Sequence, residues 1–257
     1  MPSKPEPVAI YLEVGARRTF ASAVDWPGWS RGARGEQDAV AALAAYGDRY
    51  KAVVRSAAPK FTAPKDASEF KIVKRLKGNA GTDFGVPSLG LPSDGEPIAA
   101  AELERLARIL EACWDAFDRA ARSAKGFELR KGPRGGGRDL DKMAAHVVEA
   151  DQAYIAQLGA RPPESAAGRP IKPSALHDAM LAAFRARARG LPVAEPRATK
   201  KPWTPRYFAR RVGWHVLDHA WEIEDRAIPG DLLDVVPVRM PKGKRRPSDL
   251  VRDGRGS

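Results

Sequence analysis

Alternating apolar and polar positions divide the first third of the chain into short strands and one helix. Three runs rich in β-branched or aromatic side chains have the length of strands: residues 8–14, 17–26 and 69–76. The first two runs are separated only by a Gly-Ala dipeptide, which is typical of a hairpin. Between the second and third runs, residues 35–57 repeat apolar side chains at helical spacing. The pattern predicts a small ββαβ module over residues 1–77.

From residue 98 the apolar positions follow a helical period. Residues 78–97 have no period and are rich in Gly, Pro, Ser and Asp, so we expect a linker there. Four amphipathic segments follow, with Pro- and Gly-containing connections between them. The first covers residues 98–124, and the second begins after Asp139, its N-cap, and ends at about Tyr154. The third and fourth cover residues 174–189 and 204–226. These four segments predict an all-α four-helix bundle over residues 98–232, and hence an α+β fold class for the whole chain.

Charge adds a candidate interaction surface at the C-terminal end. The 257 residues include 44 Lys and Arg against 32 Asp and Glu, which gives a net charge of +12. Residues 233–257 are especially basic and contain Pro and Gly without an apolar period. We therefore expect a flexible tail that contacts nucleic acid or an acidic partner.

Other features of the sequence indicate the cellular compartment in which the protein is expected. No apolar run approaches the ~20 residues of a membrane-spanning helix, and the N-terminus has no apolar stretch of signal-peptide length. We expect a cytoplasmic protein without a membrane partner, and the sequence leaves the oligomeric state open. The single cysteine, Cys113, lies on an apolar helix stripe, which indicates an ordinary buried thiol.

Two of the four histidines share one face of the last predicted helix. His215 and His219 are four residues apart, and Glu222 follows three residues later. A buried polar group without a partner costs about 1–3 kcal/mol, so these side chains need one. A divalent metal is one possibility, because imidazoles at this spacing lie about 6 Å apart on one helix face. Partial exposure, or pairing with Asp218, Glu222 and Glu224, is the alternative.

A third ligand would have to come from another helix. His146 is the best candidate, because it lies beside the apolar stripe of the second predicted helix. His177 has Lys172 and Asp178 close by in the sequence, so we expect it at an exposed polar position.

One histidine on the second helix and His-x3-His on the fourth resemble the DinB-like superfamily. The stretch HVLDHAWE, residues 215–222, is also similar to the corresponding segment of mycothiol-dependent maleylpyruvate isomerases. The resemblance covers most of residues 98–230 and implies a bundle that binds a divalent metal, with an acidic residue at the position of Glu222. The metal ligands that it implies are His146, His215 and His219. The superfamily's frequent His-His-Arg continuation is replaced here by WEIEDR, residues 221–226.

The N-terminal module carries a second resemblance. The stretch AVDWPGWSRGARGEQDAVAAL, residues 23–43, resembles the HicB-like antitoxin fold, in which a strand ends at a Pro-Gly turn and an Ala-rich helix packs on the sheet. The match covers about forty residues. Trp26 and Trp29 form either an exposed docking face or lids over a small core.

Three imidazoles would leave a metal ion its charge and an open coordination position, as in catalytic sites. Zinc and nickel both suit imidazole ligands. Such an ion lowers the pKa of bound water or binds a thiolate. Glu222 would accept a proton or orient a ligand imidazole, unless it is simply an exposed acid.

The loop before the second helix, residues 131–138, reads KGPRGGGR. Lys131, Arg134 and Arg138 surround three glycines close to a helix N-terminus, a setting that favours anions. We expect these residues to bind a small anionic substrate, with a plain flexible connection as the alternative.

Two functions remain open at this point. The first is a metal-dependent enzyme: a thiol-dependent S-transferase, isomerase or hydrolase that acts on a small anionic molecule, with a low-molecular-weight thiol as a further cofactor. The second is a non-catalytic binding protein, whose HicB-like module and basic tail engage a protein partner or nucleic acid.

Overall fold

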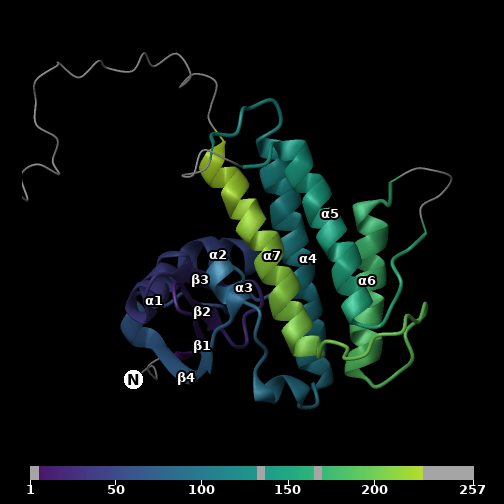
Figure 1. The fold of residues 1–257 in the computed structure, drawn as a ribbon, viewed down its shortest axis with the longest axis horizontal. Coiled ribbons are helices and arrows are strands. Elements are labelled where there is room, and N and C mark those ends of the chain that lie inside the picture. Colours follow the sequence, from purple (N-terminus) through teal and green to yellow (C-terminus); the bar gives the residue numbers. More distant parts are fainter. Residues whose placement is uncertain (1–5, 132–136, 165–169, 228–257) are drawn as a thin grey trace, which may run out of the picture.

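A computed structural model describes residues 6–131, 137–164 and 170–227, and it has an α+β fold. An N-terminal four-stranded sheet with two covering helices is followed by a region of long helices (Figure 1). The predicted fold class is confirmed. The predicted basic tail, residues 233–257, and Arg134 lie outside the described residues.

The sheet contains one strand more than the predicted ββαβ pattern. Its strands are β1 (Val8–Val14), β2 (Thr19–Ala23), β3 (Ser30–Ala33) and β4 (Phe70–Lys77). Their order is β3-β2-β1-β4, in which β1 is antiparallel to β2 and parallel to β4. The sequence Ser-Arg-Gly-Ala of β3 has no β-branched or aromatic residue, so its pairing with β2 has no local sequence signal.

The helix expected over residues 35–57 is broken at Tyr46 into α1 (Glu36–Ala45) and α2 (Gly47–Val54). Helix α1 packs on β2 and β3. Trp29 lies in the core beneath these helices, stacked on Tyr50 with ring centroids 5.4 Å apart. Its indole N–H donates to the carbonyl of Leu43 at 2.9 Å. Trp29 is therefore part of the small core and does not form an exposed docking face.

The segment expected to be a linker is tied to the sheet. It contains α3 (Ala80–Phe84) and the 3-10 turn η2 (Pro92–Gly95), and η1 (Ala67–Glu69) precedes β4. Glu13 of β1 is fully buried and accepts hydrogen bonds from the hydroxyl of Thr82 and from the backbone amides of Ser88 and Leu89, the last two at 3.0 Å. Because these donors satisfy a buried carboxylate, they fix the path of the segment against the sheet.

The four amphipathic segments of the second half are helices. They are α4 (Ala100–Ser123), α5 (Leu140–Gln157), α6 (Pro173–Ala188) and α7 (Pro205–Arg226). Asp139 caps α5, as predicted, by accepting a hydrogen bond from the amide of Lys142 at 2.8 Å. Cys113 is fully buried on α4, and burial raises the pKa of its thiol. None of the helices in the described ranges is long and apolar enough to cross a bilayer.

Helix α7 lies between the sheet and the other long helices (Figure 1). On one side it contacts α4, α5 and α6. On the other, Arg210 forms a buried ion pair with Asp94 of η2 at 2.5 Å, and its guanidinium lies 5.4 Å from the ring centroid of Tyr11 in β1. The ring of Trp214 meets Phe20 of β2 edge to face at 6.2 Å. The position of α7 is thus set from both sides.

Two glycines allow α7 to approach the sheet closely. A Cβ added to Gly213 would lie 2.9 Å from the backbone nitrogen of Gly28. Gly28 follows β2 at φ +93°, a conformation that favours glycine, and a Cβ there would lie 2.8 Å from a methyl carbon of Leu217. No other residue type fits this contact without moving α7.

Replacing Gly213 with Ala tests this close approach. Inside an exposed helix the change Gly→Ala normally stabilises a protein by about 0.5–1 kcal/mol. Here we expect the free energy of unfolding to fall by about 1–3 kcal/mol, because the added methyl group overpacks the contact with Gly28. Urea denaturation measures the difference.

Gly95→Ala is the matched control, since no atom lies within 4 Å of a Cβ built there. A Gly213→Ala protein at least as stable as the wild type would contradict the close packing of α7.

Candidate metal centre

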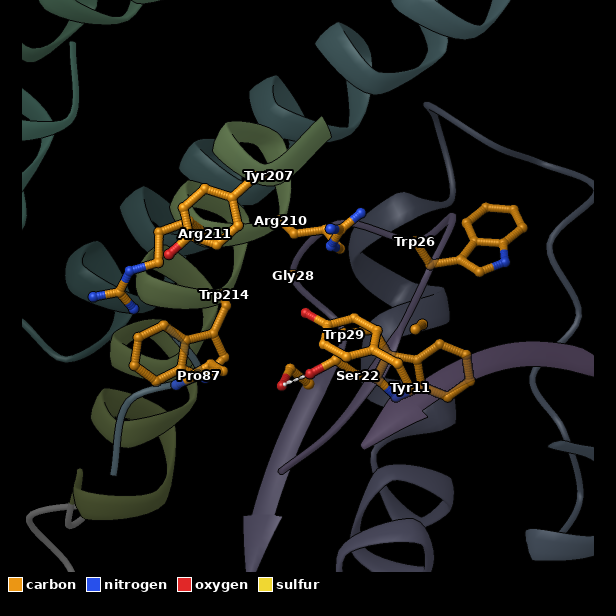
Figure 2. Close-up of a pocket in the computed structure, with 12 residues that line it drawn as sticks. Tyr11, Ser22, Trp26, Gly28, Trp29, Pro87, Tyr207, Arg210, Arg211 and Trp214 are labelled. Atoms are coloured by element: carbon orange, nitrogen blue, oxygen red, sulfur yellow. Dashed lines mark hydrogen bonds between the residues drawn. The ribbon is translucent and has the colours of Figure 1, made fainter. Parts of the chain in front are cut away.

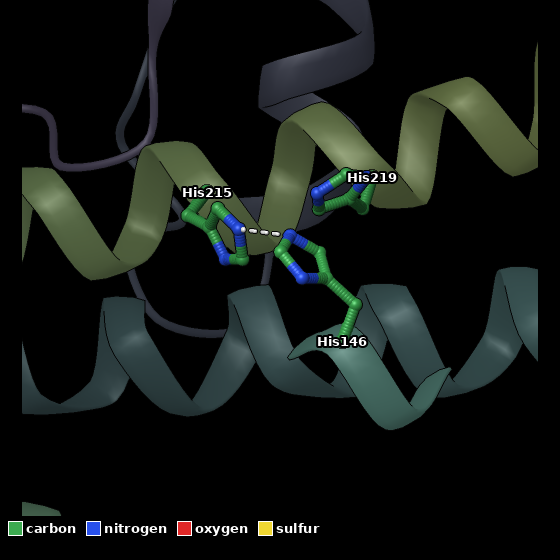
Figure 3. Close-up of side chains that lie close together, drawn as sticks. All are labelled: His146, His215 and His219. Carbon is green, nitrogen blue, oxygen red and sulfur yellow. Dashed lines mark hydrogen bonds between the residues drawn. The ribbon is translucent and has the colours of Figure 1, made fainter. Parts of the chain in front are cut away.

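Three histidines from two helices meet at one point in the helical half (Figure 3). His215 and His219 extend from successive turns of α7, and His146 reaches them from α5. One ligand atom from each ring lies within 4.8 Å of the other two. The structure thus brings together all three predicted metal ligands, although they come from distant parts of the sequence.

The spacing of the rings suits a small metal ion. The Nε2 atoms of His146 and His215 are 3.2 Å apart. Two nitrogens bound at about 2.0–2.1 Å to one tetrahedral ion would lie about 3.3 Å from each other. His146 and His215 are therefore already at the separation that two ligands of one ion require.

The electrostatic environment favours the neutral, metal-binding form of His146 and His215. Burial lowers the pKa of His215 to about 2, and the nearby charges of His219 and Arg211 act in the same direction. Burial is also the main cause that lowers the pKa of His146, and the positive charge of Arg138 is the second cause. A neutral imidazole has a free nitrogen lone pair, which is what a metal ion needs.

His215 also carries an unpaired polar atom. Its Nδ1 is buried and has no hydrogen-bond partner within the described ranges. The residue as a whole is only 7% exposed. Burial of this nitrogen without a partner costs free energy, and a metal bound to Nε2 would not remove that cost.

Glu222 holds the third histidine in place. Its Oε2 lies 3.1 Å from Nδ1 of His219, and its Oε1 accepts a hydrogen bond from Nη1 of Arg226 at 2.6 Å. The hydrogen bond with His219 is the main cause that lowers the pKa of Glu222, so the carboxylate is ionised and can only accept. Nδ1 of His219 therefore carries the proton, which leaves Nε2 free to bind a metal.

Of the basic residues predicted to bind substrate, Arg138 is close enough to the histidines for its charge to lower the pKa of His146 and His215, whereas Lys131 lines a different cavity beside Glu222. Arg138 is exposed, and its backbone carbonyl accepts a hydrogen bond from Nη2 of Arg226 at 3.0 Å. The structure gives no position for Arg134, which falls in the undescribed stretch 132–136.

The expectation of an exposed His177 is wrong. Its ring stacks on Trp114 of α4 with centroids 4.1 Å apart, and its Nε2 lies 3.4 Å from Oδ2 of Asp151. Asp151 is fully buried, and burial raises its pKa. The sequence held a signal for this pair, since Asp151 follows Val147 by four residues on the apolar stripe of α5 and needs a polar partner there.

Other residues around the centre were not anticipated. The ring of Tyr154 on α5 meets that of His215 edge to face at 5.6 Å, and the guanidinium of Arg211 lies 5.4 Å from the Tyr154 centroid. Arg211 and Trp214 also border a cavity between α7 and the sheet (Figure 2). The volume of this cavity is about 20 Å³, enough for a single water molecule and too small for a substrate.

Comparisons of the chain with protein-family models, with curated proteins and with solved structures found no match.

Proposed function

We propose that the protein binds a divalent metal through His146, His215 and His219 in a four-helix bundle of DinB-like type. We further propose that it is a metal-dependent enzyme, a thiol-dependent S-transferase, isomerase or hydrolase that acts on a small anionic substrate. The observation that carries the metal site is the convergence of three imidazole nitrogens within 4.8 Å. The reaction class rests on the resemblance of HVLDHAWE to mycothiol-dependent maleylpyruvate isomerases.

The number of ligands favours catalysis over a structural role. Structural zinc sites have four protein ligands, whereas catalytic sites keep an open position. The described residues bring three histidines together here, and Glu222 contacts His219 from behind. Zinc or nickel suits this nitrogen-rich site, and when bound such an ion would lower the pKa of water or of a thiol in the open position.

Apolar packing also holds the two helices that carry the three histidines. Met143 and Ile155 of α5 and Phe208 of α7 are fully buried. Burial of one such side chain stabilises a fold by about 1.5–3 kcal/mol. An ion in the centre is therefore free to exchange its open-position ligand without loss of the surrounding structure.

Metal analysis of the purified protein tests the site. We expect about one divalent ion per chain, measured by mass spectrometry of the element, and loss of at least nine-tenths of it in His219→Ala and His215→Ala, because two remaining imidazoles bind weakly. His177→Gln is the control, because it changes the fourth histidine and leaves the three ligands intact.

Circular dichroism separates lost ligands from lost folding in these variants. Equal metal content in His219→Ala and His177→Gln, both folded, would overturn the assignment of the ligands.

Glu222→Gln tests the role of the carboxylate behind His219. A neutral amide orients the imidazole less strongly, so we expect metal affinity to fall about 10- to 100-fold while the stoichiometry stays near one. Competition with a chromophoric chelator measures the affinity.

Glu224→Gln is the matched control. Glu224 lies two residues away on the same helix, but its carboxylate pairs with Arg49 at 2.6 Å and does not touch a histidine. If both variants bind metal equally tightly, Glu222 has no part in holding the ligand.

A further inference from the structure

A second cavity is lined in part by Glu222, the residue that also contacts His219. It has a volume of about 630 Å³, within the range of small-molecule sites. We call it the arginine pocket, and its lining residues are Arg18, Arg31, Arg130, Lys131, Asp218, Trp221, Glu222, Asp225 and Arg226. They come from the β1–β2 turn, from β3, from the chain after α4 and from α7. The N-terminal module and the helical half each form part of its wall.

The lining of the arginine pocket has an excess of positive charge. Five of its side chains are cationic and three are acidic. Each acidic group already has a cationic partner: Asp218 pairs with Arg31 at 3.0 Å, Glu222 with Arg226 at 2.6 Å, and Asp225 with Arg49 at 2.9 Å. Arg49 stands outside the lining, so its charge adds to the local excess.

Three cations of the pocket have no acidic partner among the residues that the structure describes. Within the described ranges, neither Arg18, Arg130 nor Lys131 forms an ion pair. The guanidinium of Arg130 only donates to the backbone carbonyl of Asp225 at 2.6 Å. Like charges gathered around a concave surface repel one another, and an anion placed between them relieves that repulsion.

The arginines that do pair are held rigidly. The guanidinium of Arg31 lies 3.9 Å from the centroid of the Tyr46 ring. Arg226 donates from Nε to the carbonyl of Arg130 at 2.7 Å, in addition to its bond with Glu222. Since Nη2 of Arg226 also donates to the carbonyl of Arg138, all three of its nitrogens are held, and the group contributes a fixed positive charge to the pocket.

We propose that the arginine pocket binds a small molecule through an oxyanion, either a phosphate or a carboxylate. Such groups accept paired hydrogen bonds from guanidinium groups and match the charge of Arg18, Arg130 and Lys131. The three acidic side chains in the wall interrupt its positive charge, which favours a small ligand over a nucleic-acid backbone, because the latter needs a continuous basic surface. The metal is no part of this site, so its test is independent of the proposed function.

Calorimetric titration of the full chain tests the proposal, with inorganic phosphate, succinate and neutral succinamide as probes. We expect phosphate or succinate to bind saturably with a dissociation constant below about 10 mM, and succinamide not to bind. Whichever oxyanion binds more tightly identifies the class of ligand. Absence of saturable binding by both anions, or equal binding of succinate and succinamide, overturns the proposal.

Matched variants locate the binding. Arg18→Gln and Lys131→Gln each remove one unpaired charge and should weaken binding about tenfold. Arg17→Gln should change it by less than about twofold, because Arg17 is the exposed neighbour of Arg18 and does not line the arginine pocket. Equal affinity of Arg17→Gln and Arg18→Gln would refute the location.

A metal-ligand variant separates this site from the metal centre. His215→Ala should keep the affinity for the anion within about twofold, since the ring of His215 contacts His146, His219 and Tyr154, none of which lines the pocket. Loss of anion binding in His215→Ala would place the anion on the metal and overturn the proposal. Loss of metal in that variant with anion binding retained supports both sites.

Discussion

The contact between Gly28 and Gly213 sets the distance at which α7 packs against the sheet, and the remaining architecture depends on it. Because neither residue has a side chain, the helix backbone can lie directly on the turn that follows β2. The ion pair of Arg210 with Asp94, one turn of helix earlier, secures the same face. A helix held on this side has its opposite face fixed in direction, and that face carries His215 and His219.

In this arrangement α7 contributes both to the cluster of three histidines and to the wall of the arginine pocket. Along α7, Asp218 pairs with Arg31 of β3 and Asp225 with Arg49 of α2, while the histidines face α5. Glu222 lies between the histidines and the ion-paired side chains, and it contacts both His219 and Arg226. Ligands and charges placed on a packed helix keep their geometry better than those on a loop, which favours a preorganised centre.

The sequence allowed the long helices and the three clustered histidines to be predicted, because both have short-range signals. An apolar stripe marks each long helix, and the spacing of His215 and His219 marks a shared face. The partner on α5 was found because His146 lies beside a clear apolar stripe. The resemblance to DinB-like proteins pointed to the same residues, whereas the comparisons provide no relative to support it.

Features that depend on distant contacts could not be predicted in the same way. Glu13 is satisfied by the amide of Ser88, 75 residues away, so the intervening Gly- and Pro-rich stretch looked like a linker. Strand β3 depends on its antiparallel pairing with the edge of β2, because its own residues have little strand propensity. The arginine pocket combines residues of the β1–β2 turn with residues of the last helix, and neither group alone indicates a cavity.

The ion pair of Asp94 with Arg210 also has a consequence for folding in the cell. The two residues are 116 positions apart, so a growing chain presents Asp94 long before its partner leaves the ribosome. Until then the carboxylate must stay hydrated, because an unpaired charge is too costly to bury. The strands of the sheet can pair early. The face of the sheet that packs against α7 stays uncovered until α7 has been synthesised. In an incomplete chain this exposed face can associate with other molecules.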